Sequence, residues 1–333
     1  MKRFGNDNVI NFVFKKYGIY LIFVLIIVVC SLLSPVFLTK KNIMSVLRQL
    51  SITGILAFAQ MLLIISGQID LSQGSVVALA GMVSITTYLS TGSFILTFAT
   101  AIIVAMVCGA ISGILIAKVR LPAFIATMAM DSVARGMVYI YTNGQPIYNV
   151  GDYSKVSTGY IGSIPMPVVV FIGIAGICWI ILSHTTFGRD IYAIGGNADA
   201  ANASGISVPK TTIKAYLVAG AFVGIAAVLQ MARINSGLPD TAMNYHGDAI
   251  ASTIIGGTSF TGGIGTASGT FVGSIIMGVI SNILNLTGVQ SYIQNVVKGL
   301  IIIGAVTIDL LGKNRRIRKK PIVGTKGISK AEK

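Results

Sequence analysis

The sequence predicts an all-α integral membrane protein of about ten transmembrane helices with short broken or re-entrant segments. Of the 333 residues, 54% are hydrophobic and only 11% are charged, whereas soluble domains carry about a quarter charged residues. Repeated apolar runs reach the length that a helix needs to cross a bilayer, and the alternating pattern of barrel strands is absent. These observations exclude a soluble domain and favour a helical bundle in a membrane.

The net charge of +15 lies largely near the two ends of the chain, in MKR with Lys15 and Lys16 and in the tail KNRRIRKK. There it is expected to orient the spans and to contact membrane lipid. The interleaving of aromatic and basic residues that marks a nucleic-acid surface is missing, so we expect no nucleic-acid partner. Cys30, Cys108 and Cys178 lie inside apolar runs without metal-site or disulfide spacing, which indicates inert core residues.

The first half of the chain divides into five expected spans. Ser34-Pro35 ends the first span, and the polar hinge GQIDLSQG at 67–74 separates the second from the third. A tight basic loop at 118–121 closes the fourth span, and a long polar loop at 142–167 follows the fifth. We expect these spans at 19–33, 42–66, 75–88, 94–117 and from Pro122 to about Tyr141.

The second half of the chain contains five further expected spans, at 168–183, 215–232, 248–259, 269–286 and 292–311. A polar outer loop at 235–246 precedes the short eighth span, and the glycine turn TGGIGTAS at 261–268 follows it. Several spans carry glycines four residues apart, which predicts close helix packing in lipid. These pairs are Gly109 with Gly113, Gly220 with Gly224, and Gly269 with Gly273.

Ten spans place both ends on one side of the membrane, and the basic residues indicate that this side is the cytoplasm. In this orientation 18 of the 25 Lys and Arg residues are cytoplasmic, as the positive-inside rule favours. Lys40 and Lys41 lie on the outer side, against the rule. The chain 1–333 is therefore expected to be one membrane domain, with a basic cytoplasmic N-terminal segment at 1–17 and a basic cytoplasmic tail at 312–333.

The polar segment 187–210, FGRDIYAIGGNADAANASGISVPK, is the longest clearly polar interruption on the basic side. It predicts a short cytoplasmic helix at about 196–204. Asn197 is placed to cap its N-terminus, and Asp199 adds a negative charge in the first turn. Alanines at 198, 200, 201 and 203 favour a helix without bulk, so its surface can approach a partner closely.

The limits of this expected helix depend on glycine and proline. We expect Gly195 and Gly196 to turn the chain sharply before it, because glycine adopts conformations closed to other residues. Gly205 is a natural stop, and Pro209 is expected to keep the helix from running into the next span.

Four motifs, in this order, resemble the membrane permeases of bacterial sugar ABC importers. They are GQIDLSQGSVVALAGM (67–82), LPAFIATMAM followed by RGMVYIYTNGQPI (121–147), FGRDIYAIGGNADAANASGI (187–206) and DAIASTIIGGTSFTGGIGT (248–266). The resemblance covers about 19–311 and extends to ribose, galactose, xylose and autoinducer-2 permeases, with ribose permeases the most similar. Gln68 stands where the family usually has Gly, and His246 where an acidic residue is common.

The resemblance implies a multi-pass permease in a bacterial plasma membrane, paired with a second copy or a close relative. A partner ATP-binding cassette ATPase would bind ATP and Mg, so no cofactor is expected in this chain. A periplasmic or lipid-anchored binding protein would deliver a monosaccharide, with ribose favoured; galactose, xylose, autoinducer-2 and an ion-coupled transporter are the alternatives. The residues expected to couple to the ATPase are Arg189, Gly195, Gly196, Asn197, Asp199, Ala200, Ala201, Ser204 and Gly205.

Ionisable residues within the spans are candidates for a gate or pathway, because charges at membrane depth usually face protein or water. Asp131 and Arg135 lie four residues apart on one helix face, which fits either a structural ion pair or a pathway role. Asp70, assisted by Ser72, and Asp248 are each interpreted first as helix caps. The full candidate set is Gln68, Asp70, Ser72, Asp131, Arg135, Asn143, Asp248, Gly262 and Gly263.

Enzyme classes receive no support from the sequence. There is no GxxxxGK[ST] phosphate loop, no HExxH motif and no persuasive nucleophile–base arrangement. A receptor or intramembrane enzyme is therefore disfavoured. An ion-coupled transporter would leave the 187–210 segment unexplained, whereas an ATP-driven one uses it.

Overall fold

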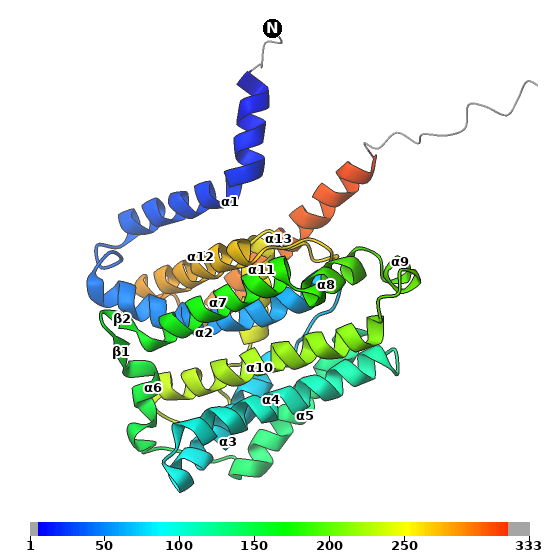
Figure 1. The fold of residues 1–333 in the computed structure, drawn as a ribbon. Helices are drawn as coiled ribbons and strands as arrows, with labels where there is room; N and C mark the ends of the chain where they lie inside the picture. Colours follow the sequence, from blue (N-terminus) through cyan, green and yellow to red (C-terminus); the bar gives the residue numbers. More distant parts are fainter. Residues whose placement is uncertain (1–5, 319–333) are drawn as a thin grey trace, which may run out of the picture.

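The computed structural model describes residues 6–318, with side chains over 19–311 (Figure 1). Most of the basic N-terminal segment and of the basic tail, 312–333, therefore lies outside the residues whose side chains are described. The helices over 6–184 are α1 (Asn6–Leu33), α2 (Lys40–Ile65), α3 (Gln73–Thr91), α4 (Phe94–Ala117), α5 (Ala123–Thr142), η1 (Gly151–Ser154), α6 (Lys155–Thr158) and α7 (Met166–His184). Those over 186–318 are α8 (Thr186–Gly196), α9 (Ala198–Ala203), α10 (Val208–Ile234), α11 (Tyr245–Ile255), α12 (Ala267–Leu286) and α13 (Ser291–Arg318).

Each of the ten expected spans corresponds to one helix of the bundle, which confirms the predicted fold class. Within the described residues, eight helices are long and apolar enough to cross a membrane: α2, α3, α4, α5, α7, α10, α12 and α13. The apolar part of α1, Ile19–Leu33, is shorter. Helix α11 has only 11 residues, so it covers about 16 Å, roughly half of the hydrocarbon thickness.

The helices α2 and α10 form the centre of the bundle. The second half of α2 is buried on every side, as expected for a helix that is apolar all round. Phe171 of α7 packs against α2 at Phe58, with ring centroids 5.7 Å apart, and stacks on Phe271 of α12 at 4.9 Å. Gln60 is the polar exception within this buried stretch.

The glycine pairs make the close helix contacts that the sequence predicts. A Cβ at Gly113 of α4 would stand 3.1 Å from Cβ of Tyr216 in α10, and one at Gly220 would stand 2.7 Å from the Ala105 carbonyl oxygen. A Cβ at Gly273 of α12 would collide with the Ser252 carbonyl of α11. At Gly220 and Gly273 a side chain would require the helices to move apart, because the facing backbones touch, and at Gly113 the contact would be tight.

The bundle has two ends, here called the β1–β2 end and the α9 end (Figure 1). At the first, strand β1 (Tyr160–Ile161) pairs antiparallel with β2 (Ile164–Pro165), and Ile147 bridges to Gly237. Buried Tyr153 of η1 anchors this end, with its hydroxyl 2.7 Å from Oγ of Ser84 in α3.

Two connecting segments can be compared with the expectations. The segment 235–246 is not a simple surface loop. It leaves α10 at the β1–β2 end, where Gly237 pairs with Ile147, and then returns into the bundle, so that the Thr241 carbonyl reaches Arg135 of α5. As expected, α9 ends at Ala203 and does not run into α10; Pro209 lies in the first turn of α10, where the missing N–H costs no hydrogen bond.

Candidate functional site

The short helix predicted in the polar segment is α9. The Asn197 side chain accepts a hydrogen bond from the Ala200 amide at 3.0 Å, so the predicted cap is confirmed. Asp199 lies in the first turn, and Gly205 has φ +86°, the left-handed conformation that ends a helix. Ser204, at the C-cap, donates to the Ala200 carbonyl at 2.9 Å.

The outer surface of α9 is exposed in the single chain. Ala200 and its polar neighbours face outward, whereas Ala201 is only 4% exposed and faces the bundle. The four alanines are therefore not equivalent, because Ala201 fixes the helix to the protein and Ala200 is free to contact a partner. Arg189 is exposed on the preceding helix α8, at the same end of the bundle.

The prediction that Gly195 and Gly196 turn the chain is wrong. Both are the last residues of α8, and the turn falls at Asn197, which has extended backbone angles. Gly195 has a different role. A Cβ there would collide with the carbonyl oxygen of Ile65 at the end of α2, whereas a Cβ at Gly196 would meet nothing within 4 Å.

The glycine turn after α11 lies against the same point. The Gly263 amide donates to the Ile65 carbonyl at 2.8 Å, and a Cβ at Gly262 would stand 2.8 Å from the Gly195 oxygen. The Tyr192 hydroxyl of α8 donates to the Gly265 carbonyl at 2.6 Å, and burial raises the pKa of Tyr192, which keeps the phenol protonated as a donor. Gly262 and Gly263 thus belong to a junction at the α9 end.

The hinge between α2 and α3 is organised around Asp70, but not as predicted. Asp70 Oδ1 accepts from the Ser72 amide at 2.8 Å and from its hydroxyl at 2.6 Å. Ser72 occupies the N-cap position of α3 without making a side-chain cap bond. The carboxylate therefore closes a local turn of the kind that Asp favours, instead of capping the helix.

Buried Gln60 of α2 holds the same hinge. With its amide oriented by the available hydrogen bonds, Gln60 donates to the Asp70 carbonyl at 3.1 Å and accepts from the Asp70 amide at 3.2 Å. The Tyr216 hydroxyl of α10 donates to the neighbouring Ile69 carbonyl at 2.7 Å. Gln68 is half-buried, and its backbone amide donates to the Leu63 carbonyl at 2.9 Å.

Asp131 and Arg135 act together, although no direct ion pair joins them among the described contacts. The Ser75 hydroxyl of α3 donates to Asp131 Oδ1 at 2.5 Å and accepts from Arg135 Nε at 3.2 Å. Arg135 Nη1 also donates to the carbonyls of Pro239 and Thr241 in the re-entrant segment, at 2.6 and 3.2 Å. Ser75, which bridges the two charges, was not predicted, because no local pattern marks it.

Asp248 is not a helix cap, which corrects the prediction. It lies in the first turn of α11, and its Oδ2 pairs with Lys298 Nζ of α13 at 2.8 Å, with both side chains about a fifth exposed or less. The partner of Lys298, unreadable from the sequence, is therefore Asp248. Farther along α13, Asp309 accepts from the Ser259 hydroxyl and the Phe260 amide at 2.9 and 3.0 Å.

Arg135 and Lys298 lie at a similar depth in the bundle. Arg135 lies seven residues before the end of α5 at Thr142, and Lys298 lies seven residues after the start of α13 at Ser291. Both are thus about 10 Å inside the β1–β2 end. Asn143, a predicted pathway residue, is instead the C-cap of α5 at the β1–β2 end itself, away from the cluster.

The charged groups form part of an outward-facing polar surface between α5 and α13, here called the polar face. It consists of Asp131, Ser132, Arg135, Asp240, Asn244, His246, Asp248 and Lys298, of which Ser132, Asp240 and Asn244 are exposed in the single chain. His246 Nδ1 is buried without a hydrogen-bond partner. Asp240 and Asn244 were not predicted, because nothing in the pattern showed that 235–246 re-enters the bundle, and Ser132 was not predicted because it carries no charge.

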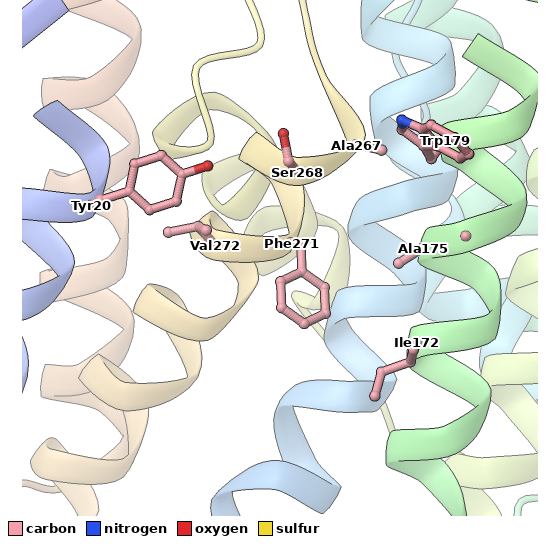
Figure 2. Close-up of a pocket in the computed structure, with 9 residues that line it drawn as sticks. Tyr20, Ile172, Ala175, Trp179, Ala267, Ser268, Phe271 and Val272 are labelled. Atoms are coloured by element: carbon pink, nitrogen blue, oxygen red, sulfur yellow. The ribbon is translucent and has the colours of Figure 1, made fainter. Parts of the chain in front are cut away.

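An apolar groove lies elsewhere. It has a volume of about 570 Å³, lies between α1, α7 and α12, and is lined by residues such as Ile172, Trp179 and Phe271 (Figure 2). None of the predicted gate or pathway residues lines it. Among the described residues no cluster of His, Cys, Asp or Glu could hold a metal ion.

Comparison with known proteins identifies the class. A family model described as a branched-chain amino acid transport system permease component matches residues 42–306. The ribose import permease of Bacillus subtilis is 38% identical over 300 residues, 89% of this chain and 93% of the relative, and that of Haemophilus influenzae is 35% identical over 295 residues, 87% and 91%. The D-allose permease of Escherichia coli is 35% identical over 299 residues, 89% and 92%. No solved structure matches the chain.

The membrane-spanning helices and the family match identify a multi-pass membrane permease. The chain belongs to this family of transport-system permease components, whose matched region covers α2 to α13 and includes both the polar face and α9. The predicted resemblance to sugar importer permeases is thereby confirmed, and so is the prediction that the chain is a transport subunit and not an enzyme.

Proposed function

We propose that this chain is the membrane subunit through which an ATP-binding cassette importer carries a monosaccharide, ribose, into the cytoplasm. The observation that carries the proposal is the polar face. Asp131, Arg135 and Asp248 lie at membrane depth on a surface that the single chain leaves partly exposed. Charges facing lipid at this depth are costly, so the face requires water or protein against it.

A second copy of the chain would satisfy this requirement. Two polar faces opposed across a two-fold axis would enclose a water-filled pathway between them, with α5 and α13 of each copy toward the axis. Carboxylates, amides and the imidazole of such a lining match the vicinal hydroxyls of a sugar, which both donate and accept hydrogen bonds. The ribose import permeases among the relatives support ribose as the substrate.

The α9 end would face the cytoplasm. Exposed Ala200 and Arg189 would contact a groove of the ATPase, which binds ATP and Mg, so this chain needs no cofactor of its own. The β1–β2 end would then face outward and receive the sugar from a periplasmic or lipid-anchored binding protein. This orientation places both termini in the cytoplasm of a bacterial cell, and the multi-pass chain in its plasma membrane.

Uptake in the native cell tests the substrate. Deleting the gene for this chain should abolish uptake of labelled ribose, and the restored gene should recover it. Unlabelled ribose should compete better than allose or arabinose. Leucine should not compete, and leucine uptake that depends on this gene while sugar uptake does not would overturn the proposal.

Two substitutions test the pathway and the ATPase contact. Ser132→Ala on the polar face should weaken uptake while the amount of folded protein stays normal, because the side chain is exposed and its hydroxyl donates only to the Met128 carbonyl of its own helix. Ser90→Ala, an exposed hydroxyl near the β1–β2 end of α3, serves as its control. Ala200→Arg should abolish co-purification with the ATPase, whereas Ala200→Ser and Thr158→Arg should preserve it. Retained ATPase binding by Ala200→Arg would place the contact elsewhere.

A further inference from the structure

We infer that the backbone junction of Gly195, Ile65, Gly262 and Gly263 transmits movement of α8 and α9 to the hinge at 66–72, and thereby to the polar face. The inference rests on the proposed function and deepens it, because it names residues that position the pathway without touching the ATPase or the sugar. The junction brings together the ends of α8 and α2 and the turn after α11.

The junction is rigid because backbone meets backbone there. The Ile65 carbonyl lies against Gly195 on one side and accepts the Gly263 amide at 2.8 Å on the other. Gly262 and Gly263 have φ of +85° and +74°, which only glycine adopts without strain. The atoms nearest to Gly195, Gly262 and Gly263 across the junction are backbone atoms, which cannot absorb a displacement by changing rotamer.

Helix α9 is connected to the junction through α8 without an intervening loop. The Asn197 amide donates to the Ala193 carbonyl of α8 at 3.0 Å, so α9 continues from α8 through a single residue. Tyr192, one turn before Gly196, ties α8 to the Gly265 carbonyl at 2.6 Å. A push on α9 therefore moves α8 and the glycine turn together.

The hinge side leads to the polar face. Ile65 is followed by Gly67 at φ +77° and then by Asp70, whose turn fixes the start of α3 at Ser72. Three residues farther, Ser75 bridges Asp131 and Arg135. A displacement at the end of α2 thus reaches the charged pair of α5 through one hinge and the first turn of α3.

Two glycine substitutions supply the test and its control. In the complete complex with ATPase and binding protein, Gly195→Ala should lower sugar uptake about ten-fold or more, because its methyl group forces the Ile65 carbonyl away. ATP hydrolysis and complex assembly should persist, and hydrolysis should lose its dependence on the sugar-loaded binding protein. Gly173→Ala in α7 should behave as wild type, because its methyl group would enter open space away from the junction and from α9. Normal coupled uptake by Gly195→Ala would overturn the inference.

A second variant decides the matter if Gly195→Ala does not fold. Tyr192→Phe adds no bulk and removes only the bond to Gly265, so it should fold and still uncouple hydrolysis from uptake in part. Unchanged coupling in this variant would count against the junction.

Hydrogen exchange separates the inference from the proposed function. Adding ATP to the wild-type complex should change amide protection at 66–72, and Gly195→Ala should suppress that change. A wild-type complex that moves no sugar but shows this change would refute the substrate and retain the junction. An exchange pattern at 66–72 that is identical in both proteins would refute the junction.

Discussion

The Asp248–Lys298 pair allows a quantitative test of how α13 is held to the bundle. The atoms are 2.8 Å apart, and the side chains are 14% and 21% exposed. Lys298→Met would leave the carboxylate largely buried without its cation, which we expect to destabilise the fold by about 3 kcal/mol, the lower end for buried pairs because some exposure remains. Asp248→Asn should cost about 2 kcal/mol, since a long lysine can move its ammonium toward water.

The double variant, Lys298→Met with Asp248→Asn, shows whether the two effects on the free energy of unfolding are independent or coupled. Independent effects would sum to about 5 kcal/mol, whereas removing both charges should cost only about 2 kcal/mol, a coupling of about 3 kcal/mol. Unfolding by dodecyl sulfate in mixed micelles, followed by circular dichroism, measures these differences. Lys155→Met is the matched control, because its pair with Asp152 is 2.6 Å long but 68% and 62% exposed, and the midpoint should not move. An additive double variant, or an equal loss from the control, would refute the reasoning.

Three further predictions concern orientation and packing. All three native cysteines are buried, so Thr158→Cys should react with an impermeant maleimide from outside intact cells and Ala200→Cys only after the membrane is opened; the reverse pattern would invert the topology. Gly109→Leu should sharply lower the yield of folded protein, because its Cβ already meets the Tyr216 backbone, while Gly173→Leu, with open space around it, should not; equal yields would contradict the packing. Tyr153→Phe loses a buried hydroxyl bond and should reduce stability by about 1 kcal/mol in the same micelle titration, and an unchanged midpoint would show that this anchor is dispensable.

The spans were predictable because each long apolar run has one stable state in a bilayer, a helix with its backbone bonds satisfied internally. The glycine pairs were predictable for the same local reason, since spacing by four residues puts both on one helix face. The cap by Asn197 depends only on the four residues from Asn197 to Ala200. In each case the determining interaction lies within about one helical turn or one span.

The long-range pairings could not be predicted, because sequence order does not show which helices face one another. Lys298 meets Asp248 from a position 50 residues away, and Ser75 meets Asp131 across 56. Gly195 shows a second limit. The sequence alone does not distinguish a glycine that turns the chain from one that lets another backbone approach. Only the position of Ile65 shows that Gly195 is of the second kind. The re-entry of 235–246 depends likewise on Arg135, which no local pattern indicates.

Helices α3 and α11 both begin inside the bundle, and their first turns lie together. A Cβ at Gly74 would stand 3.9 Å from His246 Nδ1. Each helix start carries about half a positive charge. Together with Arg135 and Lys298, these offset most of the negative charge of Asp70, Asp131, Asp240 and Asp248, and leave a small acidic excess. Such a field is nearly indifferent to a neutral sugar but unfavourable to its phosphate ester. A sugar phosphorylated in the cytoplasm would therefore enter this pathway less readily than the neutral sugar.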